Sequence, residues 1–260
     1  MNDDRAIFLA ERRERIENYQ HDRSLLEASR QFMSETLRAK YSYQFDWLGL
    51  PIIQYPQDIV AMQELIWSVQ PDLIIETGIA RGGSLMFSAS MLALLDLTES
   101  MSEYRPCDSR RSKRRVIGVD LDIRPHNRAV IEQHPLTSYI YMIEGSSIDL
   151  SVINQIRSLA NDHQKIMVCL DSNHTHEHVL AELEAYAPLV DIDSYCIVFD
   201  TLIEDFPSVT CAKRPWSQGN SPKTAVQQFL MTHSEFQIDP SIHDKLLITA
   251  AGDGFLRRLT

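Results

Sequence analysis

The fold is indicated most clearly by the stretch Leu73-Ile74-Ile75-Glu76-Thr77-Gly78-Ile79-Ala80-Arg81-Gly82-Gly83-Ser84. Its first five residues predict an apolar strand, and the glycines that follow predict a turn leading into a helix over 85–97. Glycine lets the backbone approach a ligand closely, and free N–H groups at the start of a helix suit an anion. The stretch therefore predicts a strand–turn–helix unit with a ligand at its turn.

The same alternation continues along the chain. Four more apolar strands are expected, at 116–120, 139–143, 166–171 and 195–200, with helices between them that include 152–159 and 177–186. Strands rich in Val, Ile and Leu and separated by helices favour a parallel sheet covered on both faces. The predicted fold class is α/β, with a doubly wound, mostly parallel sheet.

The two ends of the chain depart from this pattern. Residues 1–40 predict helix, 41–56 an aromatic and proline-rich ordered loop or lid, and 58–69 another helix. Near the C-terminus, 245–249 and 255–259 flank a Gly-Asp-Gly turn, which predicts a hairpin with an antiparallel last strand. We therefore expect an N-terminal helical arm and lid segment over 1–56 and a main domain over 57–260.

Composition limits the expected partners. The 25 Lys and Arg against 36 Asp and Glu give a net charge of −11, which opposes nucleic-acid binding. No apolar run is long enough for membrane insertion, and the four cysteines show no disulfide spacing, so a cytoplasmic protein is expected. The helical arm favours a homo-oligomer. The basic cluster at 110–115 could be a solvated loop or a patch for an acidic ligand, and its role stays open.

Carboxylates occupy the ends of four expected strands. Ligands of a doubly wound sheet bind at the carboxyl ends of its strands, where Glu76, Asp120, Asp171 and Asp200 are expected. Asp120 is placed to accept the two hydroxyls of a ribose. Asp171 and Asp200, from neighbouring strands, suit a hard cation such as Mg²⁺. The pattern predicts a nucleoside site beside a metal site.

A histidine follows the second pair of acids. His174 lies three residues after Asp171. A diol on the metal would have an oriented hydroxyl of lowered pKa, and His174 would take its proton as a methyl group leaves sulfur. Alternatively, His174 caps the next helix, or shares a zinc ion with His178.

Two resemblances extend this interpretation. The E-x-G-x-x-x-G-G-S pattern of residues 76–84 resembles that of S-adenosylmethionine-dependent methyltransferases. The segments 51–56, 170–183, 198–201 and 214–226 resemble the cephalosporin hydroxylase / rhamnosyl O-methyltransferase family, from about residue 45 to the C-terminus. The Pro-Trp to Pro-Lys-Thr-Ala segment is the most specific part. The resemblance implies a class I methyltransferase-like fold and transfer of a methyl group from S-adenosylmethionine to a hydroxyl of a sugar or glycosylated metabolite, assisted by Mg²⁺.

Particular residues follow from the pattern and the resemblance together. The expected cofactor-binding residues are Glu76, Gly78, Gly82, Ser84, Asp120, Ser146 and Asp171. The family's acid-x-x-His motif maps onto Asp171 and His174, as metal ligand and base. Asp200 is the other expected metal ligand. The expected substrate-binding residues are Tyr55, Arg214, Trp216, whose ring would stack on a sugar face, and Lys223.

The chain departs from the family at one position. The family's Glu-Asp metal pair maps onto Phe199 and Asp200, so one ligand is missing. The metal would then be held by Asp171, Asp200 and water, or Glu204 or Asp205 would fold back as a substitute. Two other functions remain open: a metal-dependent hydroxylase, which would need a 2-His-1-carboxylate iron site, and a non-catalytic nucleotide-binding protein. The acceptor is not identified by the sequence.

Overall fold

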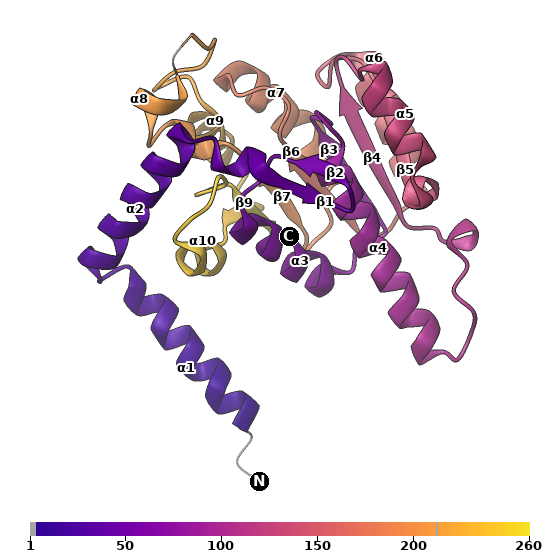
Figure 1. Ribbon diagram of the computed structural model, residues 1–260, viewed down its shortest axis with the longest axis horizontal. Coiled ribbons are helices and arrows are strands. Elements are labelled where there is room, and N and C mark those ends of the chain that lie inside the picture. The colour runs from indigo at the N-terminus through magenta and orange to yellow at the C-terminus, as the bar shows by residue number, and fades with distance from the viewer. Residues whose placement is uncertain (1–3, 212) are drawn as a thin grey trace.

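The computed structural model describes residues 4–211 and 213–260 (Figure 1). Its central sheet has the strand order β5-β4-β3-β6-β7-β9-β8. The strands are β3 (Leu73–Thr77), β4 (Arg115–Asp120), β5 (Ile140–Glu144), β6 (Ile166–Leu170), β7 (Tyr195–Val198), β8 (Phe236–Ile238) and β9 (Phe255–Arg258). The first five are parallel to one another, whereas β9 runs antiparallel to both β7 and β8. The predicted doubly wound, mostly parallel sheet is confirmed.

Helices cover both faces of this sheet (Figure 1). One apolar layer contains α3 (Pro56–Val69), α4 (Gly83–Ser102), α5 (Pro125–Gln133) and α10 (Pro240–Leu246). The other contains α6 (Leu150–Ala160), α7 (His176–Tyr186) and α9 (Pro222–Leu230). Successive strand residues face opposite layers: Ile74 packs in the first, and Leu73 and Ile75 pack in the second. Burial on both faces explains why these strands are apolar throughout.

The N-terminal region forms two helices where the sequence predicts helix over 1–40. They are α1 (Asp4–Tyr19) and α2 (Arg23–Arg38), and residues 1–3 of the prediction lie outside the described residues. The break has a local cause, because the Asp22 side chain accepts a hydrogen bond from the Leu25 N–H and so starts a new helix. No side chain of α1 is buried, and α1 points away from the sheet (Figure 1). Met33 of α2, in contrast, is buried in the body.

The segment predicted as a loop or lid contains a small hairpin, so the loop assignment was wrong in part. Strands β1 (Phe45–Trp47) and β2 (Leu50–Ile52) pair antiparallel across a two-residue turn. Leu48 and Gly49 both have positive φ, as a type I′ turn requires. The Trp47 indole donates to Ser90 of α4 over 3.0 Å, which anchors the hairpin on the first helical layer.

The predicted C-terminal hairpin was also wrong, although its antiparallel last strand is confirmed. Residues 245–249 contain no strand, because α10 extends to Leu246 and the chain then turns. The partner of β9 from this part of the chain is β8, which precedes α10. Asp239 accepts from the Ser241 N–H and starts α10, with Pro240 in its first turn. The Gly-Asp-Gly turn instead brings Gly254 against β7, where its carbonyl accepts from the Val198 N–H over 2.8 Å.

Two surface features bear on the expected partners. None of the described helices has both the length and the apolar character needed to cross a bilayer. In the basic cluster, Arg110 pairs with Asp108, and Arg114 lies between Asp96 and Glu99. Part of the charge of this cluster is therefore neutralised within the chain.

Candidate active site

A cleft of about 470 Å³ opens at the carboxyl ends of β3, β6 and β7. We call its two sides the sheet-edge side and the outer side. The sheet-edge side is lined by residues that directly follow these strands, including Gly78, Asp171 and Asp200. The outer side is lined by the end of α2, by residues 51–55, and by residues between 202 and 216. The cleft therefore lies where ligands bind in doubly wound sheets.

The glycine turn after β3 fits closely against its neighbours. Gly78 has φ +91°, and a Cβ atom on it would lie 2.2 Å from the Asp171 carbonyl oxygen. Space is also restricted at Gly83, where a Cβ atom would lie 2.3 Å from the Pro51 carbonyl oxygen. Glycine at these positions lets the turn touch both the loop after β6 and the outer hairpin.

Asp120 holds this turn from β4. Its Oδ2 accepts from the Ile79 and Ala80 N–H groups over 2.8 and 3.0 Å, and its Oδ1 accepts from the Asp122 N–H. Asp120 and Gly82 are not among the described residues that line the cleft. The structure thus gives the Asp120 carboxylate a role in shaping the turn, and its ribose contact stays a prediction.

Glu76 lies inside the protein just below the cleft. Its carboxylate is buried and accepts a hydrogen bond from the Ser84 hydroxyl, and Ser84 itself lines the cleft. Burial raises the pKa of Glu76 to about 7, although hydrogen bonds from Ser84 and Ser88 act in the opposite direction. Ser146 lies on the loop after β5 and, among the described residues, is not part of the cleft wall.

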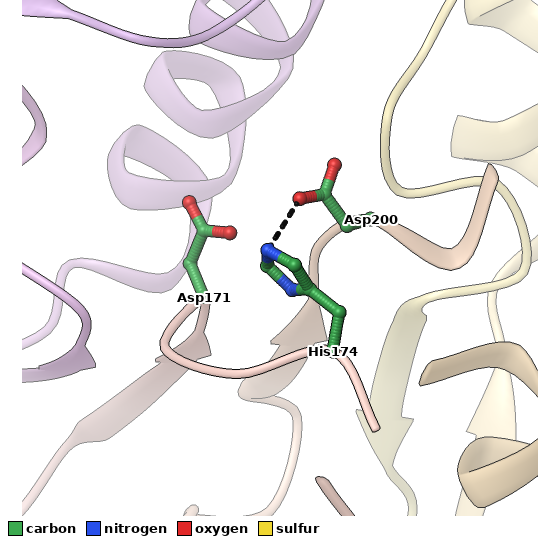
Figure 2. Close-up of side chains that lie close together, drawn as sticks. All are labelled: Asp171, His174 and Asp200. Carbon is green, nitrogen blue, oxygen red and sulfur yellow. Dashed lines mark ion pairs between the residues drawn. The ribbon is translucent and has the colours of Figure 1, made fainter. Parts of the chain in front are cut away.

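Asp171, His174 and Asp200 come together at the centre of the sheet-edge side. One ligand atom from each lies within 4.8 Å of the others. Figure 2 shows the His174 ring between the two carboxylates, with Nε2 3.0 Å from Asp200 Oδ2. Burial raises the pKa of Asp171 well above its usual range, and the negative charges of Asp200 and Glu76 raise it further. A divalent cation would relieve this repulsion, and two carboxylates are suitable ligands, so the residues fit a metal ion.

Neither proposed substitute for the missing family glutamate reaches this cluster. Phe199 is buried. Glu204 accepts from the Gly219 N–H and from the Ser221 hydroxyl, and Asp205 pairs with Lys223. Within the described residues, the cluster offers only two carboxylates and one imidazole. The alternative in which Glu204 or Asp205 folds back is therefore wrong for this conformation.

The alternative roles of His174 are not supported either. The N-cap of α7 is Thr175, so His174 does not cap that helix. His178 Nε2 lies 3.0 Å from Ser147 Oγ and 3.2 Å from Ser172 Oγ, and in the described structure His178 does not join the cluster. The alternative zinc pair is thus not brought together, because His174 precedes the helix that carries His178.

Three of the expected substrate residues line the outer side. The Trp216 ring meets the His174 ring edge-on, with 4.6 Å between centroids, and the Arg214 guanidinium lies 5.2 Å from the Trp216 ring centre. The Tyr55 hydroxyl hydrogen-bonds Thr36 of α2 over 2.9 Å. Lys223 differs, because its ammonium group lies between Asp205 and Asp253 and it is not among the described cleft residues. The structure therefore contradicts a substrate-facing Lys223, which two carboxylates hold in place.

Sequence reasoning missed the contribution of α2 to the cleft. Leu37 lines the outer side, and Met33 packs with Tyr55 and Leu202 in a small apolar cluster. The apolar side chains of α2 were a signal that it packs on another element, but they did not specify which one. Glu182 of α7 was also missed, because α7 carries Glu177 and Glu184 as well and its sequence does not single out Glu182 as the buried acid.

Comparisons with known proteins agree with this architecture. The family model Rhamnosyl O-methyltransferase/CmcI matches residues 39–259. A rhamnosyl O-methyltransferase of Mycobacterium leprae is 27% identical over 214 residues, which cover 82% of each chain. The protein of the same name from Mycobacterium tuberculosis H37Rv is 26% identical over 214 residues, covering 82% of this chain and 77% of the relative.

Solved structures show the same fold. An apo structure of CmcI aligns with a TM-score of 0.55 and 21% identity, covering 84% of this chain and 77% of CmcI. CmcI with Mg and SAM aligns with a TM-score of 0.54 and 19% identity, covering 84% and 78%. The predicted family and class I methyltransferase fold are confirmed, and the chain belongs to the Rhamnosyl O-methyltransferase/CmcI family.

Proposed function

We propose that this protein is an S-adenosylmethionine-dependent O-methyltransferase that acts on a hydroxyl of a sugar or a glycosylated metabolite. The observation that carries the proposal is the cluster of Asp171, His174 and Asp200 in a cleft beside the glycine turn. Family membership supports the reaction class, and the rhamnosyl O-methyltransferase relatives support a sugar acceptor.

His174 is the base in this proposal. When the neutral imidazole donates Nε2–H to Asp200, Nδ1 is the nitrogen that accepts a proton. The imidazolium formed in this way faces a carboxylate, which stabilises it. The hydroxyl would lose its proton to His174 as its oxygen attacks the methyl group of the sulfonium. Holding oxygen, methyl carbon and sulfur in line supplies much of the rate.

The cofactor would lie along the glycine turn. The proposed contacts are the residues expected from the sequence: Glu76, Gly78, Gly82, Ser84, Asp120, Ser146 and Asp171. Asp171 and Asp200 would hold Mg²⁺, which when bound lowers the pKa of a coordinated hydroxyl. The high pKa of Asp171, caused by burial and neighbouring acids, supports a cation at this point.

The acceptor would lie against the outer side of the cleft. Trp216 presents an aromatic ring beside His174, which suits stacking on the apolar face of a sugar. Tyr55 and Arg214 offer further polar contacts in the same cleft.

We also propose a division into an arm and lid segment (1–56) and a main domain (57–260), and self-association through the arm. A cytoplasmic location agrees with four free cysteines, two of them buried.

Calorimetry with S-adenosylmethionine and S-adenosylhomocysteine, with Mg²⁺ and then with EDTA, tests the cofactor site. Binding in both conditions would support the proposal and assign the metal to the acceptor step. Mass spectrometry of methyl α-L-rhamnoside incubated with the protein and S-adenosylmethionine tests the transfer itself. Absence of binding in both conditions would overturn the proposal.

The hydroxylase alternative is less well supported. Its iron site requires two histidines and one carboxylate, whereas the described cluster has one histidine and two carboxylates. Strict dependence of product formation on Fe²⁺ and O₂ would favour it. The non-catalytic alternative predicts that substitution of His174 leaves the function intact.

A further inference from the structure

One face of α7 carries three polar side chains into the protein. His178, Glu182 and Tyr186 are spaced four residues apart, so they lie in one row on the helix. Glu182 and Tyr186 have no measurable solvent exposure, and the His178 side chain is only 19% exposed. Buried polar groups cost free energy unless they are hydrogen-bonded, so the partners of this row matter.

The side chains of this row form hydrogen bonds with two separate loops at the sheet edge, the loop after β5 and the loop after β6. Ser172, which directly follows Asp171, donates its hydroxyl to Glu182 Oε1 over 2.6 Å. His178 Nε2 lies 3.0 Å from the hydroxyl of Ser147, on the loop after β5, and 3.2 Å from that of Ser172. Tyr186 donates its hydroxyl to the Ser147 carbonyl. The row therefore connects the loop of Asp171 and His174 with the loop of Ser146 and Ser147.

The direction of each hydrogen bond follows from the groups available. Glu182 as a carboxylate can only accept, so the Ser172 proton points toward it. The Ser172 oxygen then has to accept from His178, which places a proton on Nε2. That proton is shared between two serines on different loops. The hydrogen bonds of this row are therefore mutually consistent when His178 carries a proton on Nε2.

Stability alone does not account for Glu182. Its second oxygen, Oε2, is buried and has no hydrogen-bond partner among the described residues. A buried carboxylate with an unsatisfied oxygen is costlier than an apolar side chain of similar size. Glu182 is nevertheless at a core position of α7, where Val179 and Leu183 belong to the buried apolar layer and Ser172 donates to its carboxylate.

We propose that His178 and Glu182 are positioning residues, which hold the loop of Asp171 and His174 in register with the loop of Ser146 and Ser147. This inference rests on the proposed function, because the first loop carries the base and the second lies on the expected adenosine side. The bonds of Ser172 fix the chain immediately after Asp171. Since a displacement of about 1 Å in a reacting group costs about 100-fold in rate, this restraint bears directly on methyl transfer.

Ser172→Ala is the main test, because it removes the bond between the row and the Asp171 loop with a minimal change in volume. Tyr195→Phe is the matched control: it removes a partly buried hydrogen bond, the 2.7 Å bond to Asp239, far along the sheet from the glycine turn. With methyl α-L-rhamnoside as acceptor, we expect kcat to fall roughly 10- to 100-fold in Ser172→Ala, with KM for S-adenosylmethionine changed less than threefold. Tyr195→Phe should retain wild-type kcat.

A second measurement needs no acceptor. Amide hydrogen exchange is followed with and without S-adenosylhomocysteine in the wild type and in both variants. In the wild type and Tyr195→Phe, the ligand should protect residues 145–149 and 171–175 together. In Ser172→Ala, protection of 171–175 should be lost while that of 145–149 remains. Glu182→Gln, whose amide oxygen can still accept from Ser172, should behave more like the wild type than Glu182→Ala.

The outcomes separate the two proposals. If the wild type neither binds S-adenosylhomocysteine nor forms methylated rhamnoside, the proposed function fails, and the inference fails with it. If the wild type is active but Ser172→Ala matches Tyr195→Phe in kcat and in exchange, the positioning role alone is overturned.

Discussion

The two sides of the cleft are built in different ways. The sheet-edge side consists of residues that directly follow parallel strands, and its main groups are carboxylates, a histidine and a glycine turn. The outer side consists of residues from the end of α2, from 51–55 and from between 202 and 216, and its apolar and aromatic members include Leu37, Tyr55, Leu202 and Trp216. In the proposed function, the sheet-edge side would hold the cation and accept the proton, whereas the outer side would select the acceptor.

The two sides also differ in how far apart in the chain their residues lie. Register between neighbouring strands places Asp171 close to the glycine turn, and a small shift would remove the site. On the outer side, Met33, Tyr55 and Leu202 meet from three distant parts of the chain. We therefore expect substitutions there to alter the shape of the cleft and to leave the sheet edge intact.

The largest expected effect is on kcat, and it distinguishes the sheet-edge side from the outer side. His174→Ala should lower kcat by about 10²- to 10⁴-fold, because the proton acceptor is lost, and leave the affinity for S-adenosylhomocysteine within a factor of three. Trp216→Ala, on the outer side, should instead raise the acceptor KM about tenfold, as expected for loss of one stacking contact. Steady-state kinetics with methyl α-L-rhamnoside and calorimetry would distinguish them. Equal losses in kcat for both variants would contradict the division between the two sides.

Alanine substitutions at two glycines compare the space around the sheet-edge turn with that around an open loop. Gly78→Ala should destabilise the fold by about 4 kcal/mol, as the sum of backbone strain and overlap with Asp171. Gly219→Ala, in the loop before α9, also changes a glycine of positive φ, but its Cβ would meet no described atom within 4 Å. It should cost about 1 kcal/mol. Urea unfolding measures both free energies, and a Gly78→Ala variant as stable as Gly219→Ala would show that the turn can relax.

A third comparison lies within the N-terminal arm. Met33→Ala should lower the free energy of unfolding by about 2–5 kcal/mol, because Met33 is only 3% exposed and packs on Tyr55 and Leu202. Phe8→Ala in α1, where Phe8 is 56% exposed, should change it by less than about 0.5 kcal/mol. Thermal and urea unfolding of the monomeric protein at low concentration give the comparison. A large effect of Phe8→Ala that grows with protein concentration would point to self-association through α1.

The smallest effect is a dependence on pH. The pKa of Glu76 is raised by burial to about 7 in the folded protein, so its contribution to stability is fully present below about pH 4.5 and is lost as the pH rises through 7. Glu76→Gln removes this loss and keeps an acceptor for Ser84. The variant should therefore gain on the wild type between pH 5 and pH 8, by at most about 3 kcal/mol. Urea unfolding at both pH values checks the sign, and a gain toward low pH would refute the raised pKa.

Local sequence patterns were sufficient for the five parallel strands, the glycine turn and the acids after these strands. The apolar run at residues 73–75 indicated a buried strand because it is short and is followed by a glycine-rich turn, which leads into α4. Asp171 and Asp200 were expected to converge because parallel neighbouring strands end at the same edge. These features depend on residues close together in the chain, which is why they could be predicted.

Other features depend on which distant segments meet. The packing of α2 against Tyr55, the pairing of β9 with β8, and the burial of Phe199 required the folded chain, because an apolar pattern shows that a segment is buried but not against what. The same applies to the contact of His174 with Asp200 and to the bonds from α7 to Ser147 and Ser172. The sequence by itself predicted which chemical groups form the site. Their distances and partners were decided by the tertiary structure, because contacts between residues far apart in the chain depend on how the whole chain packs.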